Sequence, residues 1–390
     1  MGKKAIDFCT GCGLCHSIFG VPFGIDDRQF VIPQFEDNSH TYKKTIEICP
    51  FGKNGVSKFT GNVWGVYENA YRGYSANADV RFRASSGGVV SSLCMYLLNE
   101  HIVDGIILTR ADKRIPFQCE TFCARTVDEV LSACGSRYSQ SSPLMNINNL
   151  LKSGEKYCFV GKPCDVSTLK RYMTSDSNLQ KQIYCTISFF CAGMPSDSAN
   201  KRLISELGCN SCVSLRYRGF GWPGKATAID QNGSEYSMDY QSSWMNILGR
   251  DIRKSCKLCF DGIGEYADIS CGDIWNLTED KKPDFSEGEG YNIVFARSKL
   301  GDRLINDAFK GNAIFLEDWN SKIDELKYSQ PNHFIKRTTI LSKYIALKLM
   351  LQNTPKYKIK RMLAYSRKND LKTQFIVFKG TLIRILKKRL

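Results

Sequence analysis

Four cysteines near the beginning of the chain are spaced like the ligands of an iron–sulfur cluster. Three form a C-x2-C-x2-C run and the fourth precedes a proline: Cys9, Cys12, Cys15 and Cys49. Bacterial ferredoxins use C-x2-C-x2-C-x3-C-P runs, in which the fourth cysteine binds the other cluster. Phe19 occupies the fourth position of the first run, and the first three positions of a second run hold other residues: Ser39, Tyr42 and Thr45. We therefore predict a ferredoxin-like domain that keeps one of two 4Fe–4S clusters.

Haem, zinc and disulfide bonds are the alternative uses of these cysteines. Residues 12–16 also fit the C-x-x-C-H haem pattern, but covalent haem would leave Cys9 and Cys49 without a role. A structural zinc ion usually takes two separated C-x2-C pairs. The first residues contain no apolar secretory segment, so we expect a cytoplasmic protein. Disulfide bonds are disfavoured there, and thiolate-bound metal is the expected use of 17 cysteines.

A second C-x2-C pair, Cys256 and Cys259, lies in the later half of the chain. One pair cannot complete a tetrahedral or cuboidal site, so two more thiolates must come from elsewhere. Cys164 and Cys191 are candidates because we expect both in turns at strand ends, and Cys271 is the reserve. An isolated zinc-binding or redox-inert pair is the alternative.

The remaining cysteines are not assigned to metal. Cys209 and Cys212 form a third C-x2-C pair without an apparent partner. Five others lie among apolar or strand residues, and we expect them to be buried as small apolar side chains: Cys119, Cys123, Cys134, Cys158 and Cys185.

A short glycine-containing loop, Ser85-Ser86-Gly87-Gly88, precedes an apolar stretch that we expect to be helical. Free backbone N–H groups, hydroxyls and a helix N-terminus suit a phosphate or pyrophosphate. The loop matches neither G-x-G-x-x-G nor a Walker loop, and a tight turn with a serine cap is the simpler interpretation. Because an iron–sulfur protein passes single electrons, two-electron chemistry would need a converter, and this context favours a flavin.

The middle of the chain alternates between helix and strand patterns. We expect helices at residues 89–98 and 165–172, and strands at residues 102–108, 156–160 and 183–190. Residues 213–240 look rich in strands, and residues 292–309 form a last strand–helix unit. The alternation predicts an α/β (α+β) fold.

The excess positive charge is confined to the end of the chain. The net charge is +15, and residues 336–390 hold sixteen Lys and Arg residues but one acidic residue, Asp370. The rest of the chain is neutral, which argues against a nucleic-acid-binding body. An apolar stripe recurs every three or four residues near the end: Leu371, Phe375, Phe378, Leu382 and Leu386. Basic residues fall mainly between them: Lys372, Lys379, Arg384, Lys387, Lys388 and Arg389.

Such a basic amphipathic helix has two interpretations. It can lie on an anionic membrane surface, here the inner face of the cytoplasmic membrane. Alternatively, it packs its apolar stripe on the body and leaves a solvated charged face.

Six short segments together resemble one protein family. They lie at residues 85–89, 135–138, 161–164, 189–191, 256–259 and 267–273. Their order resembles the beta subunit family of coenzyme F420 hydrogenase/dehydrogenase over about residues 5–310, in a form that often accompanies bacterial polysaccharide-biosynthesis enzymes. The basic tail lies outside this region.

The resemblance implies an FAD-dependent iron–sulfur oxidoreductase. It implies FAD contacts from eight residues: Ser85, Ser86, Gly87, Gly88, Gly135, Ser136, Tyr138 and Lys162. It also favours a second 4Fe–4S cluster on four cysteines: Cys164, Cys191, Cys256 and Cys259. Lys162 as a solvated turn residue and Tyr138 as a core aromatic are the alternatives. No acid–base residue stands out, and Asp273 and Lys162 are candidates only.

The predicted organisation has four parts. They are a ferredoxin-like domain (residues 1–60), the first part of the flavin region (61–150), an α/β iron–sulfur and flavin region (151–320) and a basic helical tail (321–390). We expect electrons to pass from a ferredoxin-type donor or partner redox subunit through the clusters to FAD. The small-molecule acceptor would be a deazaflavin or a polysaccharide-pathway substrate. A non-catalytic electron-transfer subunit and a zinc-stabilised interaction module are the alternatives.

Overall fold

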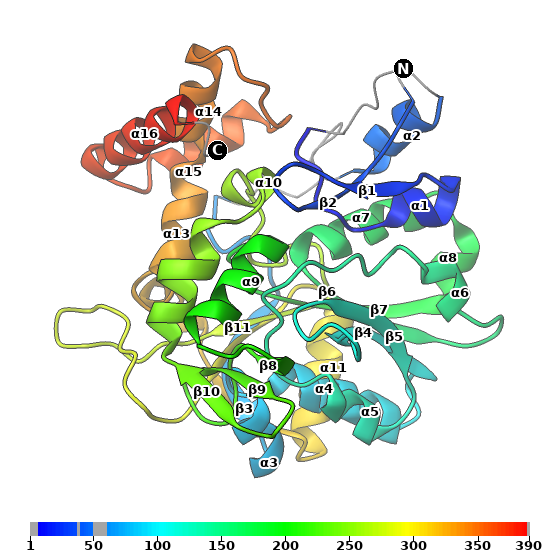
Figure 1. Ribbon diagram of the computed structural model, residues 1–390. Helices are drawn as coiled ribbons and strands as arrows, with labels where there is room; N and C mark the ends of the chain where they lie inside the picture. Colours follow the sequence, from blue (N-terminus) through cyan, green and yellow to red (C-terminus); the bar gives the residue numbers. More distant parts are fainter. Residues whose placement is uncertain (1–6, 37–39, 50–60, 388–390) are drawn as a thin grey trace.

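A computed structural model describes residues 7–36, 40–49 and 61–387 of the chain. Ser39, Pro50, Lys388 and Arg389 lie outside these ranges. The centre is an eight-stranded mixed sheet with strand order β13-β3-β12-β11-β7-β6-β4-β5 (Figure 1). Its strands are β3 (Asn69–Ser75), β4 (Gly105–Ala111), β5 (Cys119–Ala124), β6 (Tyr157–Gly161), β7 (Ile183–Phe189), β11 (Ile269–Asp273), β12 (Asn292–Ala296) and β13 (Ile314–Asp318).

Five strands of this sheet run in one direction. β4, β6, β7 and β11 pair in parallel, and β3 shares their direction because it pairs antiparallel to β12, which pairs antiparallel to β11. In the register of β6, β7 and β11, Gly161 lies opposite Ser188, and Phe189 lies opposite Cys271. The residues that follow β6, β7 and β11 therefore emerge at one edge of the sheet, where α/β proteins commonly place ligands.

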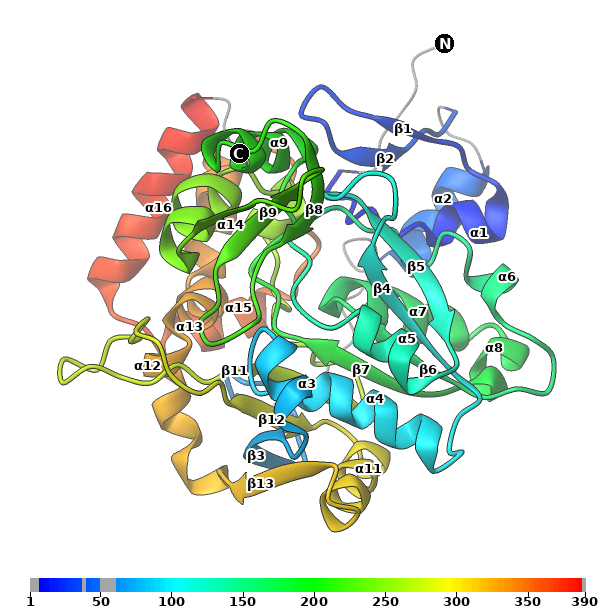
Figure 2. The same ribbon diagram turned by 60° about the horizontal axis from the view of Figure 1, so that its bottom comes forward.

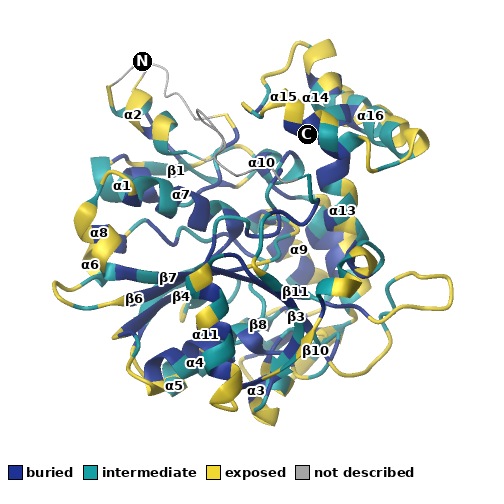
Figure 3. Ribbon diagram, turned by 180° about the vertical axis from the view of Figure 1, so that it is seen from behind, coloured by how far each residue is buried: buried dark blue, intermediate teal, exposed yellow. Residues whose placement is uncertain are grey.

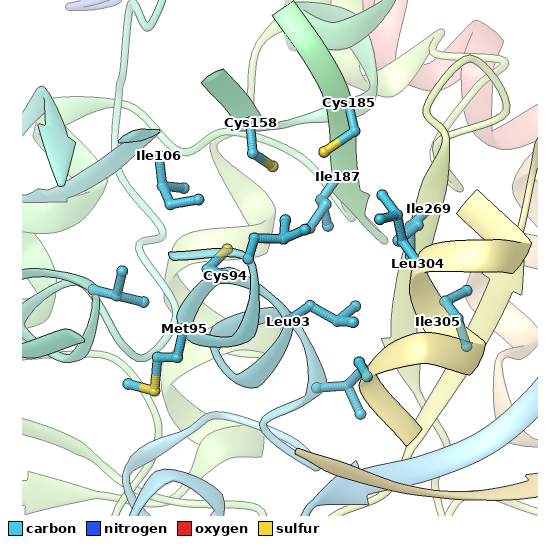
Figure 4. Packing of buried hydrophobic residues seen from close by; sticks show 14 of the residues in the cluster. Leu93, Cys94, Met95, Ile106, Cys158, Cys185, Ile187, Ile269, Leu304 and Ile305 are labelled. Carbon is cyan, nitrogen blue, oxygen red and sulfur yellow. The ribbon is translucent and has the colours of Figure 1, made fainter. Parts of the chain in front are cut away.

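Alternating side chains of the strands build a core on each face of the sheet. On one face, Ile106, Cys158, Cys185 and Ile187 pack against Leu93 and Cys94 and other helical residues (Figure 4). The helices on this face are α3 (Ala78–Arg83), α4 (Val89–Asn99), α5 (Val127–Ser132) and α11 (Lys299–Lys310). The opposite face packs Ile107, Tyr157 and Phe159 against other helices: α1 (Leu14–Phe19), α6 (Ile147–Leu150), α7 (Pro163–Met173) and α8 (Ser177–Gln182).

Two smaller units flank the central sheet. The N-terminal unit contains the hairpin β1 (Phe23–Ile25) and β2 (Val31–Pro33), with α1 before it and α2 (His40–Ile48) after it. An antiparallel sheet of β8 (Cys212–Arg216), β9 (Ala226–Asp230) and β10 (Glu235–Met238) packs with α9 (Asp197–Glu206). A π-helical segment (Gln241–Ile247), a 3-10 turn (Leu248–Arg250) and α10 (Lys254–Lys257) follow.

The end of the chain forms a group of helices beside the body. A 3-10 segment (Asn320–Glu325) and α12 (Leu326–Ser329) lead to α13 (Pro331–Thr338), α14 (Ile340–Leu349), α15 (Ile359–Ser366) and α16 (Leu371–Leu386). These helices and the N-terminal unit occupy different sides of the molecule (Figure 1, Figure 2). Among the described residues, no helix combines the length and apolar character needed to cross a bilayer.

The structure confirms most of the expected elements and adds further strands. Residues 89–98 and 165–172 lie in α4 and α7, and the expected α/β alternation builds the central sheet. In the central sheet, β3, β11 and β13 were not predicted, because these short segments lack a clear apolar alternation in the sequence. Strands from both sides of residue 150 share one sheet, so the two expected flavin regions fold together.

The expectation of burial is right for two of the five cysteines outside the metal sets. Cys158 and Cys185 are buried in the core. Cys119, Cys123 and Cys134 are only half-buried. For Cys119 and Cys123 the reason is that β5 forms the edge of the sheet.

Candidate functional site

The first cysteine set is shaped by a glycine-containing loop and by the end of α2. Gly11 and Gly13 have left-handed backbone conformations, with φ of +74° and +90°. A Cβ on Gly13 would lie 2.7 Å from the backbone of Met145, and the backbone N–H of Leu144 donates to the Cys12 carbonyl at 2.9 Å. These contacts dock the loop on the body of the protein.

The four predicted ligands of the first set lie within electrostatic reach of one another. Burial raises the pKa of the Cys12 thiol to about 11, and the charges of Asp165 and Cys9 add to the shift. Burial also raises the pKa of Cys15, with further contributions from Cys12, Cys9 and Cys49. The tertiary structure therefore brings Cys49 to the three cysteines of the loop.

The second set also comes together, from three separate segments. Cys164 lies in the first turn of α7, Cys191 follows β7, and Cys256 and Cys259 lie in and after α10. Burial and the neighbouring Cys256 raise the pKa of Cys191 to about 11. Burial raises the pKa of Cys259 to about 12, and Cys256 and Cys191 contribute to it. Burial likewise raises the pKa of Cys164, whose neighbours include Cys191 and Cys256.

The reserve ligand Cys271 lies elsewhere. Its thiol packs in the core against α4, where burial and the nearby Cys94 raise its pKa. The residue points away from the second set because side chains alternate between the two faces of a strand.

The geometry of the two sets bears on the kind of metal they would hold. All 17 cysteines are free thiols, and among the described residues no three His, Cys, Asp or Glu side chains are placed to hold a single metal ion. A zinc ion at bond lengths of about 2.3 Å would draw its four thiolates closely together. A cuboidal cluster occupies the space between its thiolate ligands, so their sulfur atoms lie farther apart than around a single zinc ion. Each of the two sets offers four thiols, the number of protein ligands that a 4Fe–4S cluster takes.

A buried ion pair lies between the two sets. The Lys162 ammonium is 2.7 Å from the Asp165 carboxylate and donates to the Ser141 hydroxyl at 2.7 Å. Burial opposes the charge of Lys162, but Asp165 and Cys164 outweigh it and keep its pKa above the ordinary value. The charge of Asp165 acts on both Cys12 and Cys164, so this carboxylate faces both sets. Lys162 is therefore buried with the thiols and is not a solvated turn residue.

Helices of the tail hold the segments that carry the second set. Lys336 lies near Cys191 and Cys259, and its charge opposes the effect of burial on both thiols. Four tail side chains donate to backbone carbonyls there: Lys336 to Ala192 (3.4 Å), Arg337 to Phe260 (2.8 Å), Lys343 to Lys257 (3.0 Å) and Tyr357 to Leu258 (2.8 Å). Sequence analysis treated the tail as a separate unit and missed this contribution.

The Ser85–Gly88 loop is fixed by its own hydroxyl groups. The Ser86 hydroxyl donates to the Tyr291 carbonyl at 3.0 Å, and the Ser136 N–H donates to the Ser85 hydroxyl at 2.6 Å. Gly87 has no room for a Cβ, which would lie 2.8 Å from the Gly73 carbonyl oxygen. Gly88 precedes α4 in a left-handed conformation and has no side chain to cap it, and the first helical N–H, of Val89, donates to Asn292 Oδ1 at 3.2 Å. The serine-cap interpretation is therefore wrong.

Arg218 lies next to this loop and was missed from the sequence. A Cβ on Gly135 would lie 3.7 Å from the Arg218 carbonyl oxygen and 3.9 Å from the Ser85 hydroxyl oxygen. The Arg218 side chain is 2% exposed and its Nη1 lies 2.8 Å from the Asp273 carboxylate. Burial disfavours its charge, but Asp273 outweighs burial and holds the pKa of Arg218 above the ordinary value. Its buried Nη2 has no hydrogen-bond partner among the residues that the structure describes.

Aromatic rings surround the guanidinium. Its carbon lies 5.0 Å from the Trp222 ring centroid, 4.8 Å from Tyr240 and 5.3 Å from Trp275. The Tyr138 hydroxyl lies 3.4 Å from Nη1, while its ring packs on Tyr217 and Trp244. Tyr138 is thus a packed aromatic whose hydroxyl reaches the site.

These features fit a flavin nucleotide. The unpartnered buried N–H of Arg218 offers a hydrogen bond to an anionic or carbonyl group, and the N-terminus of α4 lies beside it. Aromatic rings suit a planar ring system. The seven predicted flavin contacts other than Lys162 lie in this region. Arg218 lies in residues 213–240, which were predicted only to be rich in strands, and that pattern did not single it out.

The fold and the site define an α/β protein with two sets of four cysteines. The second set lies at the edge of the sheet where β6, β7 and β11 end. The chain belongs to the coenzyme F420 hydrogenase/dehydrogenase beta subunit family. The model of the family's N-terminal part matches residues 70–148, and the model of its C-terminal part matches residues 154–322.

Individual relatives support the same assignment. The chain is 26% identical to the beta subunit of coenzyme F420 hydrogenase from Methanococcus voltae, covering 68% of this chain and 88% of the relative. An uncharacterized Methanocaldococcus jannaschii protein is 25% identical over 77% of this chain and 86% of its own length. A chain of the F420-reducing [NiFe] hydrogenase complex from Methanosarcina barkeri has the same fold, with a TM-score of 0.56 and 18% identity over 74% of this chain and 96% of that chain.

Proposed function

We propose that the protein is an iron–sulfur flavoprotein oxidoreductase. It takes electrons from a ferredoxin-type donor or a partner redox subunit and delivers them through two 4Fe–4S clusters and FAD to a two-electron acceptor. When bound, the clusters carry single electrons and the flavin collects two. The acceptor is a deazaflavin, as the names of the relatives suggest, or a polysaccharide-pathway substrate, which rests on the sequence resemblance alone.

One observation carries this proposal: a cysteine of each set, Cys12 and Cys164, lies near one buried carboxylate, Asp165. Adjacent clusters favour a relay, because electrons must pass between centres that lie close together. The second set also lies near the Arg218 region. Phe189 of β7 pairs with Cys271 of β11, and two residues beyond this pair lie Cys191 of the second set and Asp273, the partner of Arg218. This order supports a path from the first set to the second set and then to the flavin.

Cationic side chains of the chain stabilise the thiolates that such clusters require. Arg253 opposes the effect of burial on the pKa of Cys9. It also donates from Nη2 to the Val31 carbonyl at 2.7 Å and to Gln140 Oε1 at 2.8 Å, so it is held in place. Lys162 serves the second set in the same way. A buried thiol needs such neighbours because burial disfavours its charged form.

The composition of the protein tests the proposal first. Anaerobically purified protein should contain about eight irons, matching sulfide and one FAD, with a visible spectrum of both groups. About four irons with FAD would remove the second cluster and keep the reductase. Zinc without flavin would contradict the proposal and support a zinc-stabilised module.

The names of relatives that are hydrogenase subunits favour a second candidate, a non-catalytic electron-transfer subunit. Purified protein that reduces an artificial dye but no deazaflavin or other small molecule would support it. Direct reduction of the deazaflavin by the purified chain would exclude it.

Replacing Arg218 by lysine should weaken FAD binding by at least about tenfold, equivalent to about 1.4 kcal/mol. Lysine keeps the charge beside Asp273 but cannot present the second N–H of the guanidinium fork. Flavin retention in equilibrium dialysis measures the effect.

The matched control is Arg216→Lys, two residues away on β8, where the guanidinium contacts Thr227 and the Phe220 ring. This control should retain FAD. Equal FAD affinity in both variants would remove Arg218 from the flavin site.

A further inference from the structure

The helical tail exposes an unusual amount of apolar surface. In the described part of the chain, 21 large apolar side chains are exposed, and eleven of them lie from residue 335 onward. In α16, Leu371 is 87% exposed, Phe375 64% and Ile376 58%. Figure 3 shows exposed positions along α14 and α16 at the outer side of this unit. Single exposed apolar residues are ordinary, but a concentration of them marks an interaction surface.

The attachment of α16 explains why these side chains face outward. Gln374 accepts a hydrogen bond from the Ser342 hydroxyl at 2.6 Å and donates to the Thr338 carbonyl at 2.9 Å. Thr381 is buried, while Phe378 and Leu382 are half-buried. Polar and small residues, together with Ile385, which packs on the cluster that contains Leu347, thus attach the helix to the body. The expectation that the whole apolar stripe packs on the body is therefore wrong.

The charge on this surface has one sign. Lys372, Lys379, Arg384 and Lys387 are all exposed on α16 or at its end. Asp370 is the one acidic residue after residue 335, and it caps the helix by accepting from the Thr373 N–H at 2.7 Å. Its charge lies at the start of α16 and leaves the rest of the helix uniformly basic.

Neighbouring helices extend the same surface. Ile345 and Leu349 of α14 are exposed, and Leu351, just after that helix, is 94% exposed. On α15, Ile359 and Leu363 are also exposed. Basic residues accompany them, with Lys348, Lys358 and Lys360 exposed in the same helices or beside them.

We propose that the exposed face of α14, α15 and α16 docks on an anionic lipid surface. Apolar side chains enter the boundary between headgroups and acyl chains, and the basic side chains contact anionic headgroups. A bilayer is favoured over a protein partner because the charge is basic throughout and apolar residues are interspersed with it. The proposal is independent of the redox cofactors.

The test uses the full-length protein and vesicles. Sedimentation with vesicles of phosphatidylcholine and phosphatidylglycerol should retain the protein, whereas vesicles of phosphatidylcholine alone should retain at least about tenfold less. The double variants Phe375→Ser/Ile376→Ser and Lys372→Glu/Lys379→Glu should each lose binding by at least about tenfold. Circular dichroism checks that each variant keeps its helices.

Matched controls lie elsewhere on the surface. Val213→Ser removes an exposed apolar side chain, and Lys201→Glu/Arg202→Glu reverses two exposed basic residues. Both should bind vesicles like the original protein. Equal binding to neutral vesicles, or equal losses in the controls, would overturn the proposal. A lipid-free dimer that Phe375→Ser/Ile376→Ser converts to monomers, without vesicle binding by the original protein, would also overturn it and assign the face to a second copy.

Discussion

Replacing Cys256 by serine should lower the iron content from about eight to about four atoms per chain and leave FAD bound. Cys256 lies close to the other three members of the second set, because its charge raises the pKa of each of them: Cys164, Cys191 and Cys259. A serine hydroxyl is a poor substitute for a thiolate ligand, so the second cluster should be lost while the first remains. Iron and sulfide analysis with electron paramagnetic resonance of the reduced protein measures the result.

The electron path gives this variant a second expected result. Reduction of FAD by a ferredoxin-type donor should slow by at least about a hundredfold, because each 1.36 kcal/mol of added barrier costs tenfold in rate. Direct chemical reduction of the flavin should be unaffected. This contrast separates a broken relay from a damaged flavin site.

Cys212→Ser is the matched control, because Cys212 also belongs to a C-x2-C pair, with Cys209, but in the small sheet. It should keep its full iron content. Unchanged iron in Cys256→Ser would mean that the second set holds no cluster. A loss of all iron in Cys256→Ser would mean that the sets do not bind clusters independently.

Replacing Glu265 by alanine should lower the free energy of unfolding by about 3–5 kcal/mol, the cost of leaving buried charges unpaired. The Glu265 side chain is 3% exposed and forms ion pairs with Arg337 of α13 and Arg361 of α15. Arg337 also donates to the Phe260 carbonyl, and both arginines lie over the rings of Phe260 and Tyr365. Chemical denaturation monitored by circular dichroism measures the change.

The exposed carboxylate of Glu317 provides the control. It pairs with Arg72 and Lys322 while its side chain is 51% exposed. Glu317→Ala should change stability by no more than about 1 kcal/mol, because water screens exposed pairs. Similar losses in both variants would contradict the buried role of Glu265.

Lowering the pH should reduce the stability of the protein through the same carboxylate, Glu265. Burial would raise the pKa of Glu265, but Arg337 and Arg361 outweigh it and lower the pKa to about 2. A group with a lowered folded-state pKa stabilises the protein at neutral pH and loses this contribution as the pH falls from about 4.5 toward 2. Glu265→Ala should therefore show a smaller loss of stability over that window than the original protein.

The sequence by itself determined the residues that are close in the chain or carry a strong pattern. Spacing predicted the first cluster, because Cys9, Cys12 and Cys15 lie on one short loop whose geometry is local. Apolar periodicity predicted α4, α7 and α16, since a helix is built from neighbouring residues. Spacing and expected turn positions made Cys164, Cys191, Cys256 and Cys259 candidates for the second set, and the resemblance to the family favoured them.

Tertiary structure decided how distant residues meet. Cys164, Cys191 and Cys256 converge because parallel strands β6 and β7 end at one edge of the sheet, where α10 packs. No local pattern pairs Arg218 with Asp273, or Glu265 with Arg337, because their separation along the chain leaves no period to detect. The orientation of α16 was also undetermined by its apolar stripe: the polar contacts of Gln374 with Ser342 and Thr338 decide which side faces outward.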